Sequence, residues 1–211
     1  MKNVNFKHIQ VQGLNLGYIT ADGEDTNETE DFHALVSKAG SGDKSALVKI
    51  GSFYEYGASF ESNNQQITIL KDIQTAIEIY KTASANGSGI AFYRLGDIYY
   101  HGVDIISNKE LAYFFFRSGA KLNEPNSLFF LGTLDFNSGN VTEAFEKIKA
   151  AADLGHPEAC YNVALALYKG DIVWKKNLPS ALGYIHKAWQ PDQDNIQYSK
   201  LMSLIKNELF S

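Results

Sequence analysis

The chain has 211 residues, of which 45% are hydrophobic and 20% charged, and its formal net charge at pH 7 is −5. An acidic chain without a cluster of Lys and Arg is a poor candidate for nucleic-acid binding, and the single cysteine, Cys160, excludes an intrachain disulfide. No segment is apolar enough for a signal peptide or a membrane span, so we expect a soluble cytoplasmic protein that does not bind membranes.

The first 31 residues differ from the rest of the chain. In residues 1–20 the apolar side chains are spaced partly by twos, which favours short extended segments over a helix. Isolated strands are marginally stable, so an ordered arm must dock on the remainder of the chain or on another chain. Residues 21–31 contain six acidic residues and no basic one. They predict a solvated linker, with electrostatic steering of a basic partner as the alternative.

A short helix is expected next. Asn27 and Glu30 resemble a capping pair, and the residues after them have helical apolar spacing. Leu35 aligns with Tyr80 of the repeats described next. Residues 32–42 are therefore predicted to form half a repeat that covers the N-terminal end of the array.

Four helical hairpins are predicted at residues 43–87, 88–123, 124–155 and 156–190. In the first helix of each, one spacing of small and apolar residues recurs: Ala46, Ile50 and Gly51; Ala91, Leu95 and Gly96; Ser127, Leu131 and Gly132; Ala159, Val163 and Ala164. The second helices repeat another set: Ala76, Tyr80 and Ala83; Ala112, Phe116 and Gly119; Ala144, Ile148 and Ala151; Ala181, Ile185 and Ala188. Both sets place small residues on one helical face, where two helices can approach closely. The pattern predicts an all-α fold, an α/α solenoid in one continuous array.

Two segments lie outside the regular hairpins. Residues 58–71 are an insertion in the first repeat, and we expect a loop that projects from one edge of the array. Residues 191–211 are predicted to form a C-terminal capping helix from about Asn195 to Phe210. Its expected apolar stripe is Ile196, Leu201, Leu204, Ile205 and Leu209.

The run A-x-x-x-L-G-x-x-Y-x-x-G-V at residues 91–103, with A-A-x-x-G at residues 151–155, resembles the Sel-one-like repeat family, a branch of the tetratricopeptide-type helical repeats. Members of that family are mostly adaptors and scaffolds and share no catalytic residues, so the resemblance implies protein binding without enzymatic activity. Asp135, Ser138 and Leu167 depart from the motif. The third and fourth copies are therefore expected to pack less regularly.

Candidate catalytic and metal-binding residues are few. His156 and Cys160 lie four residues apart and could present two metal ligands, but two ligands do not complete a zinc site. The better interpretation is that His156 starts a helix and that Cys160 is a small apolar residue near the hairpin core. The segment Gly40–Ser45 does not have the spacing of a phosphate-binding loop, so we interpret it as a turn with a cap at Asp43. No catalytic residue, cofactor or metal is predicted.

Aromatic residues recur at two positions of the first helices, seven residues apart. They are Tyr93, Phe129 and Tyr161 at one position and Tyr100, Phe136 and Tyr168 at the other. If the first helices line a concave groove, these rings form a partner-binding surface, with Asp97, His101, Asn137 and Lys169 as polar neighbours. The alternative is that the rings fill the contacts between repeats.

The function expected from these features is that of a protein-interaction module, an adaptor or scaffold whose groove binds a protein partner. An immunity or chaperone-like protein that sequesters a specific effector is one alternative. An enzyme or enzyme regulator with a small-molecule site in the groove is another.

Overall fold

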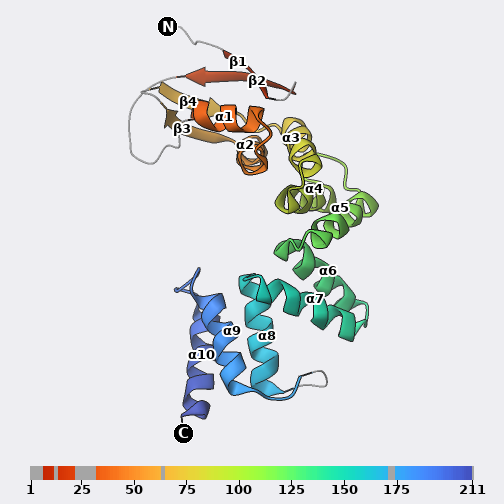
Figure 1. The fold of residues 1–211 in the computed structure, drawn as a ribbon, viewed down its shortest axis with the longest axis vertical. Coiled ribbons are helices and arrows are strands. Elements are labelled where there is room, and N and C mark those ends of the chain that lie inside the picture. Colours follow the sequence, from red (N-terminus) through yellow and green to blue (C-terminus); the bar gives the residue numbers. More distant parts are fainter. Residues whose placement is uncertain (1–6, 12–13, 22–31, 63–64, 171–173, 211) are drawn as a thin grey trace. The chain divides into compact units, whose positions relative to one another are not determined.

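The structure is a computed structural model that describes residues 7–11, 14–21, 32–62, 65–170 and 174–210 (Figure 1). The chain forms two compact units, residues 1–115 and 116–211. The first contains β1 (Lys7–Val11), β2 (Leu14–Ala21), α1 (Phe32–Gly40), α2 (Lys44–Tyr56), β3 (Ala58–Ser62), β4 (Gln65–Ile69), α3 (Ile73–Ala85), α4 (Gly89–His101) and the start of α5 (Lys109–Lys121). The second contains the end of α5, α6 (Pro125–Asn137), α7 (Val141–Asp153), α8 (Pro157–Lys169), α9 (Leu178–Trp189) and α10 (Ile196–Leu209). The described residues are mainly helical, which confirms the predicted repeat fold.

Helices α2 and α3, α6 and α7, and α8 and α9 pack as hairpins, and the small residues of the repeat lie at these contacts. A Cβ atom added to Gly51 would lie 2.6 Å from Cε1 of Tyr80, and one added to Gly132 would lie 2.8 Å from Cγ1 of Ile148. The predicted positions of the second helices are buried throughout: Ala76, Tyr80, Ala83, Ala112, Phe116, Gly119, Ala144, Ile148, Ala151, Ala181, Ile185 and Ala188. The predicted helical register is therefore confirmed.

Polar side chains in the turns determine where most of these helices begin. Asp43 accepts a hydrogen bond from the backbone N–H of Ala46 at 2.8 Å, which confirms the turn-and-cap interpretation of residues 40–45. The same role belongs to Asp72, Ser88, Asn108, Glu124, His156, Asn177 and Asn195. Each cap satisfies a backbone donor that the helix itself leaves free.

Helix α1 packs on α2 through buried Phe32, Leu35 and Ala39, as expected of a half repeat at this end of the array. The predicted capping pair, Asn27 and Glu30, and residues 22–31 of the predicted linker lie outside the described residues.

The N-terminal arm does form extended segments, and they join a four-stranded antiparallel sheet of order β1-β2-β4-β3. Strand β2 pairs with β4 through Thr20 opposite Thr68 and Ala21 opposite Ile67. The arm therefore docks on the insertion of the first repeat.

The prediction that residues 58–71 form a projecting loop was wrong, because β3 and β4 form a β-hairpin in register from Ala58–Ile69 to Ser62–Gln65. Alternate side chains of a strand point to the same face, and Ile67 and Ile69 of β4 are both buried. Phe60 packs on Phe32 and Phe53, with ring centroids 5.4 and 5.1 Å apart. The hairpin is thus part of the core of the first unit.

Helix α10 packs on α9 near the predicted bounds, but its buried side was predicted only in part. Leu201 and Ile205 are buried as expected, together with Tyr198 and Met202. Ile196 and Leu204, placed in the same stripe by the sequence, are 81% and 43% exposed. The apolar residues of α10 therefore occupy two different faces.

Candidate functional site

A chain of three aromatic rings crosses the third and fourth repeats. Phe136, near the end of α6, lies edge-on to Phe145 of α7, with ring centroids 6.3 Å apart. The Phe145 ring contacts the Trp174 ring in the connection between α8 and α9, at 5.0 Å. Phe136 remains 53% exposed, so this aromatic cluster reaches the surface of the second unit.

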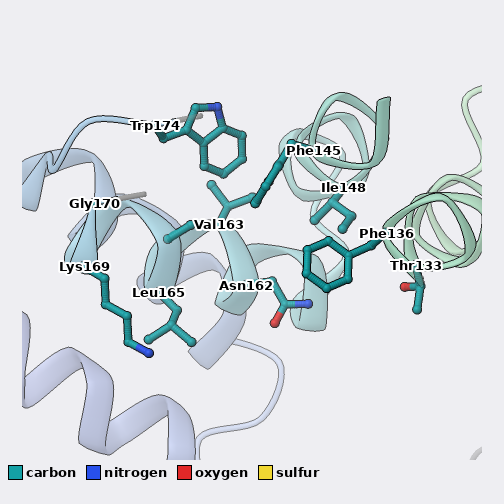
Figure 2. A pocket seen from close by; sticks show the side chains of 11 residues that line it. Thr133, Phe136, Phe145, Ile148, Asn162, Val163, Leu165, Lys169, Gly170 and Trp174 are labelled. Atoms are coloured by element: carbon teal, nitrogen blue, oxygen red, sulfur yellow. The ribbon is translucent and has the colours of Figure 1, made fainter. Parts of the chain in front are cut away.

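The cluster lines a pocket of about 390 Å³ (Figure 2). Its aliphatic lining comes from α7 and α8 and consists of Ile148, Val163, Leu165 and Ala166. The polar lining side chains are Thr133, Asn162 and Lys169. An apolar pocket with a few polar side chains is suited to an apolar group whose attached polar atoms stay near the rim.

An ion pair between α6 and α7 and a hydrogen-bonded connection between α8 and α9 position the residues that line this pocket. Asp135, which replaces the tyrosine of the motif, pairs with Lys147 at 2.7 Å and so joins α6 to α7. Gly170 ends α8 with φ +71°, a left-handed conformation in which a side chain would be strained. The backbone N–H of Asn177 then donates to the carbonyl of Leu167 at 2.8 Å, which closes the connection that carries Trp174.

The predicted groove residues of the first unit lie on α4. Tyr93 and Tyr100 are half-buried, and Lys109 Nζ lies 3.2 Å from the centre of the Tyr100 ring. His101 Nε2 lies 3.4 Å from Asp97 Oδ1 within the same helix. A protonated His101 would therefore form an ion pair at this surface.

Three predicted residues of the second unit contact side chains farther along the chain. Phe129 stacks on His156 at 4.4 Å, and Tyr161 packs on Tyr198 of α10 at 5.3 Å. Lys176 Nζ lies 5.5 Å from the centre of the Tyr168 ring. Of the six predicted rings, Phe136 lines the pocket, and of the predicted polar neighbours Lys169 does. A partner-binding role for the whole set stays a prediction.

Sequence analysis missed Phe145 and Trp174, the other two rings of the pocket. Phe145 lies on a second helix, and Trp174 lies in a connection whose length varies between repeats. The available signal was the tryptophan itself, because its ring offers a large apolar area for packing against neighbouring apolar side chains.

A buried charged cluster in the first unit was also missed. Glu55 is 6% exposed, accepts a hydrogen bond from the Tyr80 hydroxyl at 2.6 Å, and lies 3.5 Å from Nε of Arg94. Burial and the bond to Glu55 raise the pKa of Tyr80, which keeps its hydroxyl a donor. Glu55 stands at the repeat position of Tyr100, so a carboxylate in an aromatic position was the signal. The cluster links α2 and α3 to α4.

His156 and Cys160 have structural roles, as the sequence favoured. His156 Nδ1 accepts a hydrogen bond from the N–H of Ala159 at 3.2 Å, and burial lowers the pKa of the imidazole. The Cys160 thiol donates to the carbonyl of Ala152 at 3.2 Å, and burial raises its pKa. Within the described part of the chain, no group of three or more His, Cys, Asp or Glu side chains could hold a metal ion. None of the described helices is long and apolar enough to cross a membrane.

The family model of the Sel1 repeat matches residues 44–88, 90–124 and 157–188, which together make up more than half of the chain. The chain belongs to the Sel1 repeat family. The third hairpin, α6 and α7, lies between the matched Sel1 repeats and carries the departures at Asp135 and Ser138. Sel1 repeats are protein-interaction modules, and their fold is typically a non-enzymatic scaffold. A search of the curated proteins found no match.

Several solved structures resemble this Sel1 repeat chain. A Sel1 repeat protein from Oxalobacter formigenes has a TM-score of 0.64 and 19% identity, over 84% of this chain and 49% of that protein. A protective antigen with an SLR fold from uropathogenic Escherichia coli strains has a TM-score of 0.57 and 19% identity, over 87% of this chain and 38% of the antigen. An immunity protein from Pseudomonas aeruginosa has a TM-score of 0.56 and 21% identity, over 88% of this chain and 74% of that protein. The chain thus spans half or less of the first two proteins, and the likeness concerns the fold.

Proposed function

We propose that this Sel1 repeat chain binds a protein partner and that the pocket on α6, α7 and α8 takes an apolar side chain of that partner. The observation that carries the proposal is the aromatic cluster of Phe136, Phe145 and Trp174 at the mouth of an apolar pocket. Aromatic rings give a large contact area with few rotatable bonds, so they bind at a low cost in conformational entropy.

The polar groups at the pocket suit a peptide backbone. Thr133 and Asn162 offer hydrogen-bond donors and acceptors, and Lys169 offers a charged donor, beside the aliphatic lining. An extended segment could therefore place its apolar side chain in the pocket and hydrogen-bond its backbone at the rim. We extend the proposal to Tyr93, Asp97, Tyr100 and His101 on α4, as further contacts along the first helices.

The chemistry of the pocket favours binding over catalysis. Among its lining residues Lys169 is the only ionisable side chain. A lysine that acts as a base or nucleophile is usually activated by a neighbouring ionisable group or by a lowered pKa, and no second ionisable side chain lines this pocket. A catalytic site in this pocket is therefore less well supported than a binding site.

The experiment compares two exposed phenylalanines. Phe136 lines the pocket and is 53% exposed, whereas Phe114 on α5 is not one of the lining residues and is 59% exposed. Proteins captured from the native host by the immobilised chain are identified, and their affinities are measured for wild type and both variants. Phe136→Ala should weaken binding by about 5- to 150-fold, equivalent to ~1–3 kcal/mol, while Phe114→Ala should have little effect. Equal affinities for the wild type and Phe136→Ala would contradict the proposed site.

A second candidate function is that of an immunity protein that sequesters one effector. The similarity to an immunity protein from Pseudomonas aeruginosa, over 74% of that protein's length, favours it over a general scaffold. One dominant captured partner that stops growth when expressed alone, and permits growth when this chain is co-expressed, would support it. Several unrelated, non-toxic partners would instead indicate an adaptor.

A further inference from the structure

The polar side chains that line the pocket differ in what they can still offer to a ligand. The Thr133 hydroxyl donates to the carbonyl of Phe129 at 3.0 Å, so its hydrogen is already used within α6. Within the described residues, neither the Asn162 amide nor the Lys169 ammonium has a hydrogen-bond or ion-pair partner. The ammonium offers donors alone, and the amide offers two donors beside its one carbonyl oxygen. A ligand therefore needs acceptor atoms next to its apolar group.

The pocket has a positive charge that no described carboxylate neutralises. Lys169 is its only ionisable lining residue and is exposed. Lys147 and Lys176 of the same unit are instead paired with Asp135 and Glu208. The charge of Lys169 is therefore available to an anionic group of a ligand.

The other charged side chains of the pocket helices do not offset this charge. On α7, Glu143 and Glu146 lie about 130° or more around the helix from the mean direction of the two α7 side chains that line the pocket. On α8, Glu158 is at the opposite end of the helix from Lys169. Lys175, which follows the pocket tryptophan in the sequence, is exposed and adds a second positive charge nearby. The surroundings of the pocket are therefore basic, although the chain as a whole is acidic.

The two uncommitted groups lie along one side of α8. Asn162 and Lys169 are two helical turns apart, about 10 Å along the axis, and Leu165 lies between them. Figure 2 shows these three side chains pointing to the same side of the helix. An extended chain advances about 3.3 Å per residue, and its side chains two residues apart point to the same face. A segment that follows α8 with one side chain in the pocket can therefore bring a side chain two residues away, about 7 Å along, to Lys169.

From the uncommitted donors, the positive charge and the spacing along α8, we infer that the partner segment is extended and acidic. It has an aspartate or glutamate two residues from the apolar side chain that enters the pocket. The carboxylate pairs with Lys169, and a backbone carbonyl of the segment accepts a hydrogen bond from the Asn162 amide. The inference rests on the proposed function and names the class of segment that the pocket selects.

Four peptides with capped ends provide the probes. The acidic peptide is Ser-Glu-Ser-Phe-Ser-Glu-Ser, the basic peptide has lysine in place of both glutamates, and two further peptides have alanine in place of the phenylalanine. An acidic residue on each side of the phenylalanine allows either direction of the bound segment. Binding to the full chain is followed by the indole N–H signal of Trp174 in NMR spectra, which Trp174→Phe distinguishes from that of Trp189, the other tryptophan.

The acidic phenylalanine peptide should shift the Trp174 signal with a Kd of about 1 mM or lower. It should bind about three- to tenfold more tightly than the basic phenylalanine peptide, and added salt should reduce the difference. The net charge of the chain, −5, would by itself favour the basic peptide, so the expected order reports the local charge at the pocket.

Variants of the protein locate the carboxylate. Lys169→Gln should remove most of the preference for the acidic peptide, and Lys169→Glu should reverse it. The matched control is Lys200→Glu, which makes the same change at an exposed lysine of α10 that does not line the pocket, and it should leave the preference unchanged. Phe136→Ala should weaken both phenylalanine peptides alike. All three positions are exposed, so the fold is expected to tolerate the changes.

The outcomes separate this inference from the proposed function. If phenylalanine binds better than alanine but the acidic and basic peptides bind equally, or the basic one binds better, the pocket takes an apolar side chain and the inference of an acidic segment is wrong. A preference for the acidic peptide that survives Lys169→Glu would overturn the inference in the same way. If phenylalanine gives no advantage over alanine, or no peptide binds at concentrations up to about 1 mM, the proposed pocket fails and the inference fails with it.

Discussion

Replacing Gly51 by alanine tests the close packing of the first hairpin. The added Cβ would lie 2.6 Å from Cε1 and 2.9 Å from Cδ1 of Tyr80, closer than such atoms approach without a shift. Tyr80 cannot easily move, because its ring is fully buried and its hydroxyl is bound to Glu55. The collision should therefore distort the contact between α2 and α3.

The size of the effect follows from two opposing contributions. Alanine is favoured over glycine within a helix by about 1 kcal/mol, whereas overpacking a core costs about 1–3 kcal/mol. We expect Gly51→Ala to lower the free energy of unfolding by about 1–2 kcal/mol. The matched control is Gly183→Ala in α9, where an added Cβ would meet nothing within 4 Å. Helix propensity alone should raise the free energy of unfolding of this control variant by about 0.5–1 kcal/mol.

Thermal unfolding followed by far-ultraviolet circular dichroism measures both variants. A change of 1 kcal/mol corresponds to about 2–4 °C in a chain of this size, so the two midpoints should move in opposite directions from that of the wild type. If Gly51→Ala raises the midpoint as much as Gly183→Ala, the contact between Gly51 and Tyr80 does not limit the approach of the two helices, and the packing argument fails.

Three further predictions concern buried contacts. The pKa of His156 is lowered in the folded protein because burial disfavours the charged imidazole, so the stability that its neutral cap contributes is complete above the unfolded pKa near 6.5 and is lost as pH falls below it. His156→Asn should remove this pH dependence in urea titrations at several pH values. Tyr80→Phe removes one of the donors to buried Glu55, which keeps Arg94 beside it, and should lower the free energy of unfolding by ~1.5–3 kcal/mol. An unchanged urea midpoint would show that the bond contributes nothing. Phe129→Ala should lower the thermal midpoint because Phe129 stacks on His156, whereas Phe136→Ala should leave it nearly unchanged; equal losses would make both rings core residues.

The helical part of the fold could be predicted because its determinants are local. Ala46, with Ile50 four positions later and Gly51 beside it, marks the close face of a helix, and Asp43 marks where the helix begins. These signals recur in each repeat, so four weak patterns support one another. The predicted positions of Gly51 and Gly132 against second-helix side chains are confirmed.

The sheet and the pocket depend on contacts that no local pattern specifies. The alternation in residues 65–69 permits a strand, but its pairing with residues 14–21 follows from tertiary structure. Phe136 was singled out by its repeat position, whereas Trp174 belongs to the connection between the two helices of a hairpin, whose length and sequence vary between repeats. In α10, one helix turn contains both buried Leu201 and exposed Leu204, and only the position of α9 distinguishes them.

The pairing of β2 with β4 has a consequence for the order of folding. Thr68 follows its partner Thr20 by 48 residues, and two helices lie between them, whereas the hairpins close through near neighbours. At typical translation rates the ribosome needs roughly 2–10 s to synthesise that interval. Strand β2 is therefore synthesised before β4 and can pair with it only later. Until β4 is available, the backbone donors and acceptors along this edge of β2 can pair with other chains. Six acidic residues follow the arm in the sequence, at residues 22–31, and because like charges repel we expect them to disfavour pairing of the open strand with other copies of the chain.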